Sequence, residues 1–286
     1  MKTTEHIQRI VDYLRAHPAL NVVLVTAYFF FILFMHHPLV LLSIAIEKRI
    51  GIELYNVAVA VIFLSVVAAV IYVLVKAFRQ HRENRRLKVF YLVATLLLLV
   101  IHSRFMFDSN IEVIHAMEFT FLSFLIFPLV SRFGAAVFFT LPFMLIDEWY
   151  QYILLYPDWN DYFDLNDILM DTYGCGLTMS ALMILGIKNA KHHIALTRRA
   201  EFISWALLII LVLAAVQLCF IAPYASDTCG NTLLIMNERI TPEPFLRFHP
   251  SHNIWYHVMQ PAEGFAVIML LHLFYFGMDG LSKHTA

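Results

Sequence analysis

The chain has 286 residues, of which 60% are hydrophobic and 14% are charged, whereas an ordinary soluble domain carries about 25% charged residues. Water cannot solvate most of such a surface, so the composition excludes an ordinary soluble protein and makes membrane lipids the expected partners. The formal net charge of -1 provides no basic field over the molecule, so no nucleic acid is expected as a partner.

Residues 1–19 predict an amphipathic helix on the cytoplasmic side, ahead of the first membrane span. Ile7, Ile10, Val11 and Leu14 share one face of this helix. The next apolar run is not followed by a small-residue cleavage site, which argues against a removed signal peptide. We therefore expect this segment to remain and to lead into the bundle.

Eight apolar runs predict an all-α fold, a polytopic transmembrane helical bundle. A hydrocarbon core of about 30 Å needs roughly 20 helical residues, and only helices or closed barrels satisfy the backbone there. The predicted spans are residues 20–42, 55–77, 88–106, 111–131, 134–156, 165–187, 202–224 and 262–279. Within the first span, Pro38 follows His36 and His37, which favours a break here and a surface helix after it.

The positions of Lys and Arg predict that both termini are cytoplasmic, because cytoplasmic loops are enriched in these residues. With eight spans, the basic clusters at 76–88 and 188–199 both face the cytoplasm, and Lys48, Arg49, Arg104, Arg239 and Arg247 are left outside. The expected organisation begins with the amphipathic N-terminal segment at 1–19, three spans in 20–106 and a polar three-helix core at 111–187. A basic cytoplasmic loop at 188–201 follows, and then two spans in 202–286 that are joined by an external loop at 225–261.

Three cysteines are too few for a disulfide framework. Cys175 falls inside a predicted span, whereas Cys219 and Cys229 both fall near the predicted outer face. Pairing of these two is possible in that place, and the sequence leaves it open.

Polar residues gather at one level of three consecutive spans, although a charged side chain at the centre of a span costs about 3 kcal/mol. They are His115 and Glu118 on the fourth span, Asp147, Glu148 and Gln151 on the fifth, and Asp164, Asp167, Asp171 and Gly174 on the sixth. Consecutive spans with short connections pack antiparallel, so we expect these groups to converge at the extracytoplasmic side. For Asp161 and Asp164, capping of the sixth helix is the alternative.

Carboxylates outnumber basic groups in this set, so either something positive binds or some carboxyls stay protonated. A divalent metal is one expected cofactor, with the tentative ligands His115, Glu118, Glu148 and Asp167. In an enzymatic interpretation the catalytic residues are Glu148 as base, Asp167 and His115. The ligand-binding candidates are Glu118, Asp147, Gln151, Asp171 and Gly174.

In their order and spacing these motifs resemble the VanZ-like membrane protein family, named for a glycopeptide-resistance protein, over about residues 115–178. Glu148 and Gln151 match the family's E-x-x-Q pair, Asp167 its Asp and Gly174 its Gly. Asp171 stands where the family has Asn, and the family's Arg is replaced within residues 158–162. The resemblance implies a protein of the bacterial cytoplasmic (inner) membrane that handles a cell-envelope lipid or glycopeptide-related ligand, and the missing Arg favours a bound cation.

Outside the core, His249, His252 and His257 with Glu263 match no strong zinc signature, so we expect histidines packed among aromatic residues. The sequence has no P-loop, dinucleotide motif or Ser-His-Asp order, which leaves nucleotide use and nucleophilic hydrolysis without support. A proton- or cation-coupled transporter or binding protein, and a non-catalytic accessory membrane protein, stay open as alternatives to an enzyme.

Overall fold

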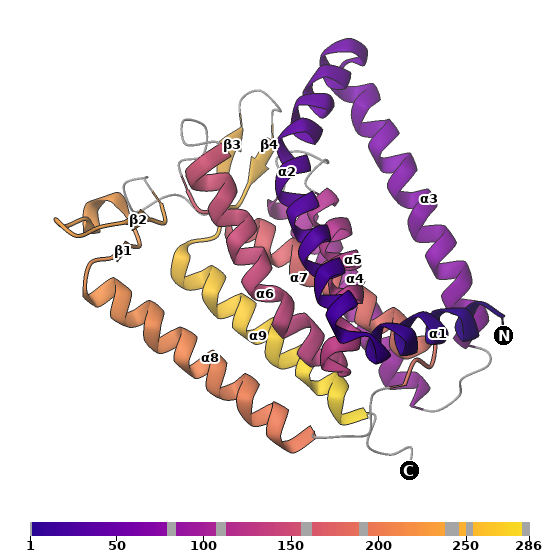
Figure 1. The fold of residues 1–286 in the computed structure, drawn as a ribbon. Helices are drawn as coiled ribbons and strands as arrows, with labels where there is room; N and C mark the ends of the chain where they lie inside the picture. Colours follow the sequence, from indigo (N-terminus) through magenta and orange to yellow (C-terminus); the bar gives the residue numbers. More distant parts are fainter. Residues whose placement is uncertain are drawn as a thin grey trace.

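The computed structural model describes residues 2–78, 84–106, 113–155, 162–188, 194–237, 246–249 and 254–281. Within these residues the structure is mostly helical, with nine α-helices (Figure 1). The helices are α1 (Lys2–Ala16), α2 (Pro18–Ile50), α3 (Ile52–Phe78), α4 (Arg85–Met106), α5 (Val113–Val130), α6 (Phe133–Tyr150), α7 (Leu165–Ile184), α8 (Ile194–Gln217) and α9 (Pro261–Leu281).

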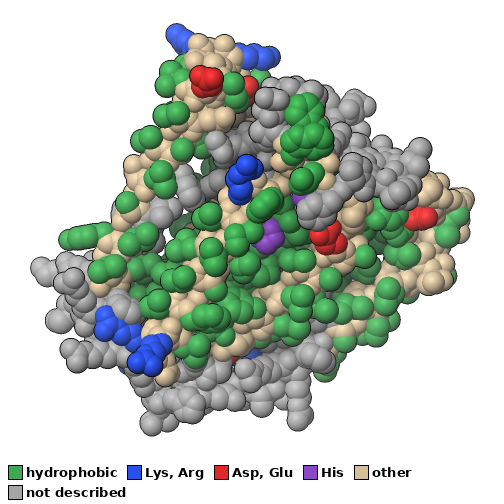
Figure 2. Space-filling model, turned by 180° about the vertical axis from the view of Figure 1, so that it is seen from behind, with side chains coloured by type: hydrophobic (Ala, Val, Ile, Leu, Met, Phe, Trp, Pro, Cys, Tyr) green, Lys and Arg blue, Asp and Glu red, His purple; other side chains and the backbone are tan. Residues whose placement is uncertain are grey.

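Three helices of the described chain are long and apolar enough to cross a bilayer: α2, α4 and the segment Pro261–Asp279 of α9. Shorter apolar helices lie at Ile52–Ile62, Ile114–Val130 and Ala206–Gln217. These elements have the length and composition of a membrane-associated helical protein. The surface agrees, because green hydrophobic side chains are spread over the face drawn in Figure 2, where charged side chains are few among the described residues.

Hydrogen bonds between the ends of different helices show in which direction each helix runs. At one end, which we call the Asn166 end, the Asn166 amide donates to the backbone oxygen of His257 (2.9 Å), and His257 N–H donates to the Phe105 oxygen (2.6 Å). At the other, the Arg132 end, Gly134 N–H donates to Asp279 Oδ1 (2.9 Å). The start of α7, the end of α4 and the approach to α9 therefore share one end, and the start of α6 and the end of α9 share the other.

Helix α7 occupies the centre of the bundle, where α4, α5, α6 and α9 surround it. Almost every residue of α7 is buried, including the large side chains of Leu165, Met170 and Tyr173. By contrast, α3 and α8 lie at the periphery (Figure 1) and expose large apolar side chains such as Val61 and Leu211. Exposed apolar faces of this kind suit contact with lipid.

Helix α1 docks against the Arg132 end of the bundle. Val11 and Leu14 are buried on its apolar face. Arg15 donates to Ser131 Oγ (3.1 Å) and to the Lys188 backbone oxygen (2.6 Å), and its guanidinium lies over the Phe127 ring. The amphipathic helix expected in residues 1–19 is confirmed, and its apolar face packs on protein.

The break expected at Pro38 is wrong, since α2 is one helix through that residue. A proline removes one backbone hydrogen bond, but packing of the surrounding turns maintains the helix here. The helix ends instead at Gly51, whose φ of 83° and N–H bond to the Glu47 oxygen turn the chain into α3. With 33 residues, α2 is about 50 Å long, longer than the core of a bilayer.

Two further expectations need correction. The segment 188–201, expected to be a loop, is helical from Ile194 onward, because its Ala, Leu and Arg residues are good helix formers. The all-α expectation missed two small sheets in the region of the predicted external loop: β1 (Ile221–Ala222) with β2 (Leu234–Ile235), parallel, and β3 (Arg247–His249) with β4 (Ile254–Tyr256), antiparallel. A short 3-10 turn, Ala225–Asp227, lies between β1 and β2.

Candidate functional site

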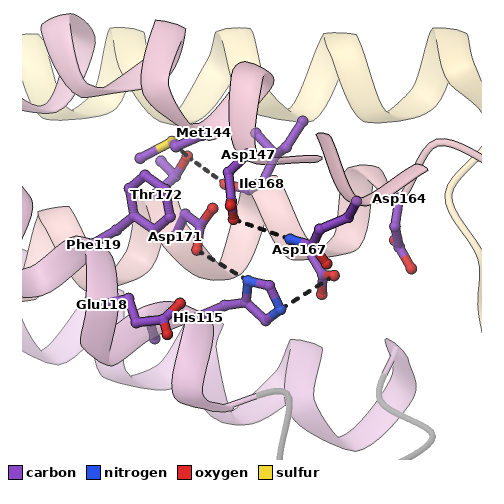
Figure 3. Close-up of polar contacts among 12 residues, drawn as sticks. His115, Glu118, Phe119, Met144, Asp147, Asp164, Asp167, Ile168, Asp171 and Thr172 are labelled. Atoms are coloured by element: carbon purple, nitrogen blue, oxygen red, sulfur yellow. Dashed lines mark hydrogen bonds and ion pairs between the residues drawn. The ribbon is translucent and has the colours of Figure 1, made fainter. Parts of the chain in front are cut away.

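Polar side chains of α5, α6 and α7 converge near the Asn166 end, as expected from the sequence (Figure 3). His115 of α5 lies between two carboxylates of α7. Its Nε2 is 3.5 Å from Asp167 Oδ2, and its Nδ1 is 3.7 Å from Asp171 Oδ1. The i, i+4 spacing of these two aspartates places both on the face of α7 that meets α5. Hereafter the acidic cluster means His115, Glu118, Asp147, Glu148, Asp167 and Asp171.

Helix α6 contributes Asp147, which accepts a hydrogen bond from Gln151 Nε2 (3.0 Å). Gln151 opens a π-helical turn, Gln151–Leu155, that continues α6. Single π-helical turns are rare and are frequent at functional sites. The Gln151 amide thus bonds Asp147, whereas the motif pairs it with Glu148, and it orients the carboxylate of Asp147.

Glu148 lies next to the start of α7. Its Oε1 accepts a hydrogen bond from the Asp164 backbone N–H (2.7 Å), and Asp164 Oδ1 in turn accepts from the Asn166 N–H (2.8 Å). The capping role weighed for Asp164 is confirmed; Asp161 lies outside the described residues. One oxygen of Glu148, the expected base, is therefore engaged in positioning α7.

Like charges crowd the centre of the acidic cluster. Glu118, Asp147, Glu148 and Asp167 all lie close enough to Asp171 to repel charge on its carboxylate. Asp147, Glu148 and Asp171 are each at most 2% exposed. Coulomb repulsion between such carboxylates is strong where water is excluded.

Five buried atoms of this cluster have no hydrogen-bond partner in the part of the chain that the structure describes. They are His115 Nδ1, Glu118 Oε2, Asp147 Oδ1, Glu148 Oε2 and Asp171 Oδ1. Four of the five are carboxylate oxygens, which accept and do not donate when ionised. An unsatisfied polar group in a dry interior costs about 1–3 kcal/mol, so the cluster is short of hydrogen-bond donors.

Gly174 lies in a helix contact and not among the carboxylates. A Cβ at this position would lie 2.0 Å from the backbone oxygen of Ala116. Thr120 Oγ1 donates to the Gly174 oxygen (3.1 Å), and Thr178 Oγ1 donates to the Thr120 oxygen (2.9 Å). Its part in the motif is to let α5 and α7 approach closely, which brings His115 to Asp171.

The structure does not assemble a preformed metal centre from the expected ligands. Among the described residues, no group of three or more His, Cys, Asp or Glu side chains is arranged to hold a metal ion. His115 instead directs its two ring nitrogens at two different carboxylates, Asp167 and Asp171. Metal binding stays a prediction.

Of the external histidines, His257 is fully described and does not join this cluster. His257 is buried and its Nε2 contacts Glu263 Oε2 (3.0 Å), which also accepts from the Gln260 N–H (3.3 Å) at the start of α9. This is one half of a capping box. His252 lies outside the described residues.

The open question of the cysteines is settled by a disulfide. Cys219 and Cys229 are bonded, and Cys175 is buried as a free thiol. The bond ties the end of α8 to the segment that follows it. It lies in the region expected to be external.

Two histidines on helices next to α5 and α7 were not predicted as part of a site. His36 of α2 is buried, with its ring 5.5 Å from the ring of His115, measured between centroids. His102 of α4 is half-buried and hydrogen-bonds the Tyr173 hydroxyl of α7. A polar residue inside an apolar span is the sequence feature that could have indicated both histidines. At His36, the nearby proline instead favoured the prediction of a helix break.

Comparisons of this chain with protein-family models, with curated proteins and with solved structures found no match.

Proposed function

We propose that this chain is an integral membrane protein of eight transmembrane helices, with both termini in the cytoplasm, whose acidic cluster binds the cationic group of a membrane lipid on the extracytoplasmic side. The observation that carries the proposal is the set of buried carboxylate oxygens on α5, α6 and α7 that no donor in the described part of the chain satisfies. A protonated amine fits this deficit, since an ammonium group offers three donors and a positive charge.

The orientation rests on two independent features. Helix α7, which precedes the basic segment 188–199 of the sequence, ends at the Arg132 end, where the Lys188 backbone oxygen accepts a hydrogen bond from Arg15, and cytoplasmic segments are enriched in Lys and Arg. The Cys219–Cys229 disulfide follows the end of α8 nearer the Asn166 end. Disulfides persist in oxidising compartments outside the cytosol, so both features support an extracytoplasmic acidic cluster.

The resemblance to VanZ-like proteins supports the same proposal by its motifs. Glu148, Gln151 and Asp167 of the motif lie at the cluster. The resemblance favours a bacterial cytoplasmic membrane and a cell-envelope lipid as the ligand. We propose binding and assign no reaction.

Two neutralising substitutions test the proposal, Glu148→Gln and Asp167→Asn. Both retain the shape of the side chain, and in Glu148→Gln the amide oxygen can still accept the hydrogen bond from the Asp164 N–H. We expect folded protein in normal amount, because each change relieves repulsion among the carboxylates. Loss of one charge-assisted hydrogen bond, about 1.5–3 kcal/mol, weakens the affinity for the lipid at least about tenfold.

The measurement is native mass spectrometry of the gently extracted full chain, with elemental analysis after chelator-free purification. Wild type is expected to carry one amine-bearing lipid, and the exposed-site control Asp227→Asn should retain it. Stoichiometric metal in wild type that is lost in Glu148→Gln would overturn lipid binding and assign a metal site. Disappearance of both variants from the membrane would instead show that the acidic cluster is needed for folding and overturn its role in lipid binding.

A further inference from the structure

A cavity of about 210 Å³ lies between α2, α3 and α5, beside the acidic cluster. Its walls are largely apolar, with Leu39 and Ile46 from α2 and Val59 from α3 among them. Pockets for drug-sized ligands measure about 300–1,000 Å³. The cavity therefore suits a single hydrocarbon segment and is too small for a glycopeptide.

The polar groups of this cavity connect it to the acidic cluster. Glu118 lines the cavity and belongs to the cluster, and its Oε2 is one of the buried oxygens without a hydrogen-bond partner among the described residues. His36 also lines the cavity, and its ring contacts that of His115. The cavity thus has largely apolar walls, and Glu118, a member of the acidic cluster, is among its lining residues.

The neighbouring helices leave this cavity on the lipid-facing side of the bundle. Helices α2 and α3 meet at the Gly51 turn and diverge from it (Figure 1). Large apolar side chains on both, such as Leu42, Leu54 and Val57, are exposed.

We propose that this cavity is a lateral entrance for a single-chain amphiphile with a primary ammonium group, whose alkyl chain lies between α2 and α3 and whose ammonium meets Glu118. The inference rests on the proposed function of the acidic cluster and names the class and route of its ligand. Charge complementarity selects the ammonium, because the only carboxylate that lines the described cavity is Glu118. The apolar walls select the chain, at about 0.8 kcal/mol for each buried methylene.

The test uses three photoreactive probes that share a twelve-carbon chain with a diazirine near its end and differ in bearing an amine, a hydroxyl or a carboxylate. The full chain is reconstituted in phosphatidylcholine nanodiscs, irradiated and mapped by mass spectrometry. The amine probe is expected to label residues 39–59 at least about tenfold more than the carboxylate probe, a difference of about 1.4 kcal/mol. Equal labelling by all three probes, or labelling spread evenly over the helices, overturns the proposal.

Matched variants separate the cavity from the cluster. Val59→Trp fills the cavity and should abolish labelling, whereas Val61→Trp, at an exposed position of α3 outside the cavity, should not. Glu118→Gln should reduce amine labelling to the level of the hydroxyl probe. Unchanged labelling in Val59→Trp overturns the entrance.

The failure of the entrance is distinguishable from that of the acidic cluster. If the co-purified lipid is lost in Glu148→Gln but the probes never label α2 or α3, lipid binding by the acidic cluster is supported and the lateral entrance is overturned. If Val59→Trp blocks amine labelling while Glu148→Gln and Asp167→Asn retain their lipid, the lateral entrance is supported and lipid binding by the acidic cluster is overturned.

Discussion

At the scale of single residues, the acidic cluster depends on small side chains as much as on charged ones. His115 reaches Asp171 because α5 and α7 approach to backbone contact at Gly174 and Ala116. Hydroxyl groups of Thr120 and Thr178 bridge the same contact. In a membrane, where lipid is as apolar as the helix surface, close packing of small residues and interhelical hydrogen bonds are main sources of helix association.

Gly174→Ala is expected to destabilise the protein. Ala is preferred over Gly in a helix by about 1 kcal/mol, but the added Cβ would meet a backbone oxygen at 2.0 Å, and backbone cannot yield as a flexible side chain does. Overpacking of this kind costs about 1–3 kcal/mol, so the clash outweighs the propensity. The temperature at which the detergent-extracted protein loses its monodisperse chromatographic peak should fall.

Gly230→Ala is the matched control, because a Cβ there meets nothing within 4 Å. Its effect should stay within about 0.5 kcal/mol. If Gly174→Ala behaves like this control, α5 and α7 do not meet as closely as described.

At the scale of elements, the beginning of α7 is held by side chains from two sources. Asp164 caps its own helix through the Asn166 N–H, and Glu148 of α6 binds the Asp164 N–H. Asn166 then fixes the segment before α9, since its side chain contacts the backbone of both His257 and Met259. The residues that hold α7 in register are thus adjacent to the residues that form the site.

Substitution of Asp164 should separate its capping from its charge. Asn caps a helix about as well as Asp, whereas Ala at an N-cap costs about 1 kcal/mol. Asp164→Asn is therefore expected to leave stability and lipid content near wild type, and Asp164→Ala to lower stability by about 1 kcal/mol. Thermal unfolding of both variants, with lipid content by native mass spectrometry, checks this. A loss of lipid in Asp164→Asn with unchanged stability would instead place Asp164 in the binding site.

At the scale of the whole molecule, opposite chemistry marks the two ends of the bundle. The Arg132 end holds a buried ion pair between Arg132 and Asp279 (3.6 Å) and the docked helix α1. The opposite side carries the small sheets, the disulfide and the acidic cluster. This polarity agrees with the proposed orientation, in which the two ends face different solvents and redox conditions.

Single cysteines should report this orientation directly. A cysteine placed within residues 80–86 is expected to be protected from an impermeant thiol reagent in intact cells, and one placed within 158–161 to react. Native thiols give little background, since Cys175 is buried and Cys219 and Cys229 are bonded. Labelling at 80–86 before permeabilisation, with none at 158–161, would contradict the orientation and move the acidic cluster to the cytoplasmic side.

The sequence by itself determined the helical elements and the candidate residues of the site. Apolar runs long enough for a bilayer predicted most helices close to their observed bounds, because backbone in an apolar environment must satisfy its hydrogen bonds within the helix. The exceptions are α2, which continues to Ile50, and α8, which runs from Ile194 to Gln217. The i, i+4 spacing of Asp167 and Asp171 and the i, i+3 spacing of His115 and Glu118 predicted their shared faces. Both signals are local, so they can be read from consecutive residues.

The tertiary structure alone decided which partners these faces meet. The continuity of α2 through Pro38 and the small sheets depend on packing that no local pattern records. The meeting of His36 with His115 and the cavity beside Glu118 join segments that are far apart in the sequence. Such long-range contacts are fixed by how helix surfaces interlock, and that information lies in the whole set of surfaces and not in any one segment.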